Sequence, residues 1–130
     1  MESLARLLRL SACVGIALLA GGANLPSAMV GPGEWEVSKS ATGSGERVCL
    51  SDPAVLMQWE HRGEQCDQTL LTSSNDRAEV HYTCPGGGFG TSHVESLTPR
   101  SVRVDSQGIS DRYPFALTIY AHRIGPCEGR

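Results

Sequence analysis

The chain has 130 residues and a formal net charge of -3, with 11 basic and 14 acidic side chains. This length leaves room for one domain of ordinary size and excludes a two-domain enzyme. The slight acidic excess provides no broad basic surface for phosphate backbones, so we expect no nucleic-acid partner. With 40% hydrophobic and 19% charged residues, the composition is typical of a globular protein rather than a disordered one.

The first 28 residues have the organisation of an export signal. Arg6 and Arg9 precede an apolar run over residues 10–20, and no charged residue follows Arg9 until Glu34. The apolar run falls within the roughly 7–15 residues of a signal-peptide core and is shorter than the roughly 20 that cross a bilayer. We therefore predict a signal peptide over residues 1–28, with an uncleaved anchor as the alternative.

Small residues offer two cleavage points for this signal, after Ala28 or after Ala23. Cleavage removes Cys13 and leaves residues 29–130 as a single small disulfide-bonded, β-rich domain without a membrane span. We expect this domain to be exported and secreted across the membrane.

The remaining cysteines are Cys49, Cys66, Cys84 and Cys127, and an even number in an oxidising compartment predicts two disulfides. Spacing leaves three connectivities open. We prefer Cys49–Cys66, which would hold both ends of a docked helix, and Cys84–Cys127, which would tie a central strand to the C-terminus. No Cys or His pair has the short spacing of a zinc site, so we expect neither a metal nor a cofactor.

Alternating polar and apolar residues predict short strands, each with one buried face, along most of the chain. These strands centre on residues 34–38, 66–72, 80–84, 91–97, 102–104 and 115–121. Turn-forming residues cluster between them at 74–76, 85–88, 98–99 and 106–108. Short strands at short spacing favour an antiparallel meander.

One helix is predicted, because Ser51-Asp52-Pro53 combines capping residues with a proline at the first helical position. Val55, Leu56 and Trp59 would share one face, and Gly63 would end the helix. Two or three turns are marginal alone, so the helix must dock on the sheet. The predicted fold class is α+β, mostly β: a curved antiparallel meander of five to seven strands with one short docked helix and two disulfides.

The segment Trp59-Glu60-His61-Arg62-Gly63 combines an aromatic ring, both charge signs and an imidazole. Trp59, His61 and Arg62 are therefore the weak candidates for a binding site. In the alternative interpretation, Trp59 packs under the helix while Glu60, His61 and Arg62 form its polar end. Like His93 and His122, His61 is expected to be solvent-exposed.

No catalytic residues are assigned. The chain lacks a Gly-x-Ser-x-Gly motif, and Ser92 and His93, adjacent on a strand, would point to opposite faces. The glycine-rich segment 86–90 is predicted to be a hairpin loop rather than a phosphate loop, because an alternating strand pattern follows it. Phe89 at its tip is expected to fold back on the sheet.

Several elements occur together here in one order: Gly-x-Trp-Glu-Val at 33–37, Cys49 followed by Asp52 and Pro53, Tyr-Thr-Cys at 82–84, and a terminal Cys127. With the signal peptide, this combination resembles an exported bacterial family known as domain of unknown function family 3617, over nearly all of residues 31–130. The resemblance implies a small periplasmic β-rich domain and brings no activity or catalytic residues.

Export, disulfides and the lack of a catalytic constellation favour a non-catalytic binding module for a small molecule or an envelope component. One alternative is an assembly partner of another envelope protein, which would need an exposed apolar patch. Another is a hydrolytic enzyme that uses Trp59–Arg62. A cavity beneath the sheet would favour the ligand over the protein partner.

Overall fold

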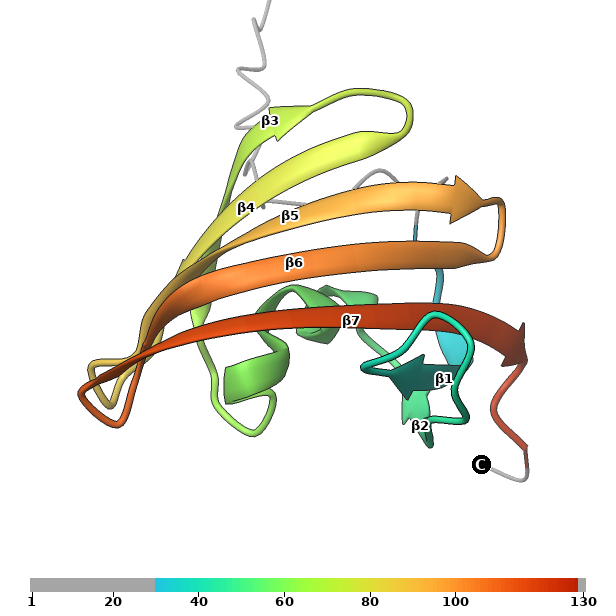
Figure 1. Ribbon diagram of the computed structural model, residues 1–130, viewed down its shortest axis with the longest axis horizontal. Coiled ribbons are helices and arrows are strands. Elements are labelled where there is room, and N and C mark those ends of the chain that lie inside the picture. Colours follow the sequence, from blue (N-terminus) through green and yellow to red (C-terminus); the bar gives the residue numbers. More distant parts are fainter. Residues whose placement is uncertain (1–29, 129–130) are drawn as a thin grey trace, which may run out of the picture.

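A computed structural model describes residues 30–128. It contains one seven-stranded antiparallel sheet, in the spatial order β2-β1-β7-β6-β5-β4-β3, curled around a short helix η1 (Figure 1). The predicted mostly-β meander with one docked helix and two disulfides is thus confirmed. The elements are β1 Gly33–Ser38, β2 Glu46–Leu50, η1 Pro53–His61, β3 Asp67–Ser73, β4 Arg77–Thr83, β5 Phe89–Thr98, β6 Ser101–Ser110 and β7 Tyr113–Gly125.

The predicted signal peptide and its cleavage after Ala23 or Ala28 lie outside the described residues. Within residues 30–128, no helix is long and apolar enough to cross a membrane.

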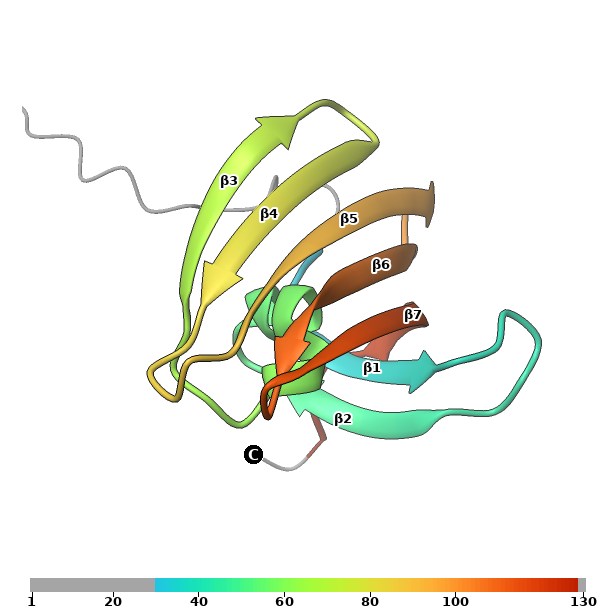
Figure 2. The same ribbon diagram turned by 60° about the vertical axis from the view of Figure 1, so that its left-hand side comes forward.

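Strands β3 to β7 follow one another as neighbours, whereas the β1–β2 hairpin joins the sheet by pairing β1 with β7. Figure 2 shows η1 on the concave side of the curl. The core forms between them, because alternate side chains of the strands point toward the helix. Its most buried large members are Trp35, Tyr82, Leu56, Met57 and Ile119.

Helix η1 is a 3₁₀ helix with an interruption at Gln58, where φ is -128°. The Asp52 carboxylate accepts a hydrogen bond from the Ala54 backbone amide at 3.0 Å, as is typical of a capping residue. At the other end, the Gln58 side-chain amide donates to the carbonyls of His61 and Glu64, at 3.0 and 2.8 Å. These bonds end the helix at His61, two residues before the predicted Gly63.

One predicted turn is wrong: Ser106–Gly108 lies inside β6. Ser106 is buried and its hydroxyl is 2.6 Å from that of Ser92 on β5, which satisfies two polar groups in the core. The chain instead reverses at Asp111 and Arg112, whose φ angles of 49° and 72° suit a two-residue hairpin turn. An Asp-Arg pair is not a typical sequence for this turn.

The structure differs from the sequence-based expectation at two further places, strand β2 and Phe89. β2 was not predicted, because its residues are mostly exposed at the edge of the sheet and show no clear alternation. Phe89 does not fold back on the sheet; it begins β5, pairs with Thr83 and Ile109, and is 43% exposed.

All four predicted cysteines are paired, but the preferred connectivity is wrong: the disulfides are Cys49–Cys127 and Cys66–Cys84. Because β1 lies between β2 and β7, Glu34 is opposite both Cys49 and Gly125, and Cys127 follows within reach. Cys66 and Cys84 flank the β3–β4 hairpin at the same end.

Tryptic mapping of the unreduced protein will test this connectivity, because cleavage after Lys and Arg places each cysteine on its own peptide. We expect peptide 48–62 to be linked to 124–130, and 63–77 to 78–100, when digestion follows acidic denaturation that prevents exchange. Links of 48–62 to 63–77 or to 78–100 would contradict the structure.

The two disulfides should differ in their contribution to stability. They close loops with sequence separations of 78 and 18 residues. In the chain-entropy model these contribute about 4.5 and about 3 kcal/mol to the free energy of unfolding. Urea denaturation should therefore find the C49S/C127S variant less stable than the C66S/C84S variant. The reverse order would contradict the chain-entropy model for this protein.

Candidate functional site

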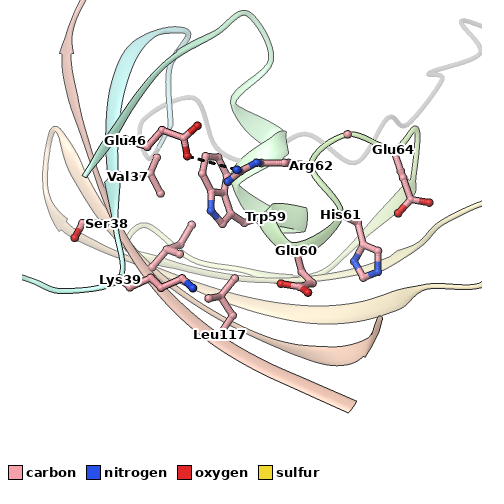
Figure 3. A pocket seen from close by; sticks show the side chains of 12 residues that line it. Val37, Ser38, Lys39, Glu46, Trp59, Glu60, His61, Arg62, Glu64 and Leu117 are labelled. Carbon is pink, nitrogen blue, oxygen red and sulfur yellow. Dashed lines mark ion pairs between the residues drawn. The ribbon is translucent and has the colours of Figure 1, made fainter. Parts of the chain in front are cut away.

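The C-terminal end of η1 faces β1 and β7 across a cleft of about 500 Å³ (Figure 3). The sheet side of this cleft is formed by the apolar residues Val37, Leu117 and Ile119, together with the polar residues Ser38 and Glu46. All three residues that the sequence singled out as weak candidates, Trp59, His61 and Arg62, line the cleft, so the kinked helix end brings them together at one place.

Trp59 and Arg62 connect the end of the helix to the edge of the sheet. Trp59 is 8% exposed, and the Arg62 guanidinium carbon lies 4.3 Å from the centroid of its ring. The same guanidinium is 3.4 Å from the Glu46 carboxylate on β2. A stacked cation and an exposed ion pair each contribute about 1 kcal/mol at most, so this trio mainly positions one wall of the cleft.

Two charges of opposite sign, Lys39 and Glu60, border the apolar wall. Figure 3 shows both side chains directed toward the cleft, on either side of Leu117 in that view. Neither takes part in an ion pair within the part of the chain that the structure describes. Both charges are therefore free to meet a ligand.

His61 is buried, with 6% exposure, so the expectation of a solvated side chain is wrong. Its Nδ1 is 2.9 Å from the Tyr82 hydroxyl, and its ring packs edge-on against Tyr82 and Phe115. The other ring nitrogen, Nε2, is buried without a hydrogen-bond partner among residues 30–128. His93 and His122 are exposed, as expected.

Gly88 lies directly over Nε2 of His61. A Cβ at this position would overlap Nε2, so only glycine lets the β4–β5 loop close over the imidazole. The loop is a hairpin connection, as predicted, in which the Cys84 amide donates to the Gly88 carbonyl at 2.8 Å. Gly88 therefore serves close packing on His61.

Burial, together with the negative charges of Glu60 and Glu64, raises the pKa of Tyr82 from 10.0 to about 12. Tyr82 is fully buried and is consequently a neutral phenol at physiological pH. A neutral hydroxyl can either donate a hydrogen bond to Nδ1 of His61 or accept one from the Nδ1–H group. In the second case the proton of the neutral imidazole is on Nδ1, and Nε2 carries a lone pair.

One cluster among the described residues has metal-binding atoms close together: His61, Glu64 and Cys84, within 4.8 Å of one another. The Cys84 sulfur is bonded to Cys66, and a disulfide sulfur is not a thiolate ligand. As long as this bond exists, the cluster offers only an imidazole and a carboxylate.

Two other hollows of similar volume are less suited to an amphipathic ligand. One, of about 580 Å³, is lined mainly by polar groups, including Gln58 and Gln68. The other, of about 470 Å³, lies at the glycine loop beside His61 and Arg112. Each has only one aliphatic side chain from the sheet, Leu50 in the first and Ile109 in the second, where the cleft has three.

The fold and this site define a class: small disulfide-linked domains in which an open antiparallel sheet curls around a single helix and leaves a cleft at its end. The family model described as "Protein of unknown function (DUF3617)" matches residues 30–127, and the chain belongs to this family. No curated protein and no solved structure matches the chain.

Sequence reasoning missed the groups that surround His61, namely Tyr82, Phe115 and Gly88. Alternation did place Tyr82 and Phe115 on inward faces, but it could not show that the end of η1 lies against them. Lys39 and Leu117 of the cleft were likewise missed, because they join the site only through the β1–β7 pairing.

The Tyr82→Phe variant should separate two effects of this hydroxyl. At pH 7 it removes the hydrogen bond to His61, which should lower the free energy of unfolding by about 1 kcal/mol. Because the folded pKa is above the unfolded one, ionisation of Tyr82 favours unfolding: the wild type keeps its full stability below pH 10 and loses about 3 kcal/mol as pH rises through 12.

The variant lacks this titration, so its stability should fall less steeply between pH 10 and 12 in urea denaturation series. Tyr120→Phe is the matched control, because Tyr120 lies between the inward-facing Ile119 and Ala121 and points to the convex face. Equal slopes in Tyr82→Phe and wild type would refute the assignment.

Proposed function

We propose that this protein is a non-catalytic binding module and that its cleft binds a small amphipathic molecule. The observation that carries the proposal is a cleft of about 500 Å³ with three apolar side chains on its sheet side and, beside them, two charges that form no ion pair among residues 30–128. This volume falls in the range of roughly 300–1,000 Å³ that is usual for small-molecule sites, which combine apolar surface with a few polar groups.

The wall and the charges indicate the chemistry of the ligand. Val37, Leu117 and Ile119 would pack against an apolar body. Lys39 would pair with an anionic group and Glu60 with a cationic one, so a zwitterion, or a molecule with a single charge, fits the cleft better than an uncharged hydrocarbon.

The absence of catalysis is part of the proposal and rests on the chemistry around the candidate groups. His61 shares its hydrogen bond with a neutral phenol, which is a poor nucleophile. The Ser92 hydroxyl donates to the buried Met57 carbonyl at 2.5 Å, and exposed His93 lies on the other face.

We also infer that the protein functions in the periplasm or outside the cell. The two disulfides support this location, because disulfides persist in oxidising compartments and are rare in the cytosol.

A thermal-shift screen of the exported protein against amphipathic metabolites and fractionated envelope extracts tests the proposal. A ligand at ten times its Kd should stabilise the protein by about 1.4 kcal/mol, or raise Tm by about 5–10 °C. Leu117→Trp should abolish the shift because the larger ring fills the cleft from β7. A screen in which no fraction raises Tm would refute the proposal.

Tyr120→Trp is the matched control, since it introduces the same indole ring on the convex face of the same strand. It should respond to the ligand as the wild type does. Lys39→Gln and Glu60→Gln will identify the ligand charge, because each should weaken only a ligand that carries the opposite charge. A shift that survives in Leu117→Trp would place the ligand elsewhere.

A further inference from the structure

Three side chains with metal-binding atoms meet where η1 ends and β4 ends. One atom each from His61, Glu64 and Cys84 lies within 4.8 Å of the other two. Ligand atoms around tetrahedral zinc, at bond lengths of about 2.0–2.3 Å, are roughly 3.3–3.8 Å apart. Glu64 is exposed, so its side chain can rotate to bring the ligand atoms closer together.

The buried imidazole of His61 already has the arrangement of a metal ligand. A metal-bound histidine usually holds the ion with one ring nitrogen and is oriented by a hydrogen bond from the other. Here Nδ1 shares a hydrogen bond with Tyr82, while Nε2 is buried and has no partner within the described residues. A buried polar atom without a partner destabilises the fold, and coordination of an ion would supply the missing partner.

A hollow lies beside His61 and Glu64. It has a volume of about 470 Å³ and is also lined by residues 86–88 of the glycine loop. Gly88 covers Nε2 at the wall of this hollow, so the β4–β5 loop must shift for an ion to reach the nitrogen.

We propose that reduction of the Cys66–Cys84 disulfide opens a site for a divalent, zinc-like cation on His61, Glu64 and Cys84. A dithiol donates two electrons and two protons, the sulfur–sulfur bond breaks, two thiols form, and the dithiol becomes a disulfide. Binding of the cation then releases the Cys84 thiol proton to solvent. A thiolate and an imidazole favour zinc over calcium or magnesium.

Of the two cysteines in this disulfide, only Cys84 belongs to the cluster. The other disulfide, Cys49–Cys127, belongs to no such cluster among residues 30–128. The proposal does not depend on the cleft ligand, because the metal requires none of Val37, Leu117 and Lys39.

Cys66→Ser and Cys84→Ser form a matched pair for the test. Both remove the same disulfide and keep Cys49–Cys127, but only Cys66→Ser leaves the Cys84 thiol beside His61 and Glu64, without any reductant. In anaerobic titrations with Co²⁺, we expect Cys66→Ser to bind one ion with a thiolate-to-cobalt absorption band. Cys84→Ser and the oxidised wild type should show no such band.

Adding Glu64→Gln to Cys66→Ser should weaken cobalt binding at least tenfold, and this exposed residue can change without disturbing the core. Adding His61→Ala should abolish the specific site. The reduced C49S/C127S variant should bind as well as the reduced wild type. Circular dichroism will verify the fold of each protein.

Three results would overturn the proposal: no thiolate band in Cys66→Ser, an equal band in Cys84→Ser, or affinity unchanged by both Glu64→Gln and His61→Ala. A Cys66→Ser protein that is unfolded at 25 °C would also overturn it, because the site requires a fold that survives loss of this disulfide. None of these results bears on the thermal-shift test of the cleft.

Discussion

The pairing of β1 with β7 is the contact on which the rest of the structure depends. It joins the first strand of the described chain to the last, with Val37 opposite Ala121. It brings Cys49 within reach of Cys127, and it places Val37 beside Leu117 in the wall of the cleft. Because the two segments are far apart in sequence, the loop between them must be ordered before this pairing is gained.

The second determinant is the way in which polar groups hold η1 against the sheet. Gln68 on β3 donates to the Ala54 carbonyl and to the Gln58 side chain, both at 2.9 Å, and Ser92 donates to the Met57 carbonyl. Buried hydrogen bonds of this kind are directional, whereas apolar packing alone would allow the helix to slide. They fix the helix end, and with it Trp59, His61 and Arg62, at the edge of the cleft.

The cleft and the metal-binding cluster share His61 and Glu64 but use different chemistry. The cleft relies on apolar surface and on two charges, and it is formed in the oxidised protein. The cluster needs the Cys84 thiolate, so the state of one disulfide decides whether a cation can bind. Tyr82 links them, because its neutral hydroxyl orients the imidazole that lies at their boundary.

The sequence by itself determined most strands, the short helix and the fact that four cysteines form two disulfides. It also singled out the segment Trp59–Arg62 as a candidate site. Alternation, caps and cysteine parity could show this much because they are local or compositional signals. Only the tertiary structure decided which cysteines pair, that Ser106 lies within a strand, and that His61 is buried against Tyr82. Each of these depends on which distant segments become neighbours, and a period-two pattern shows that a side chain faces inward without showing what it will meet there.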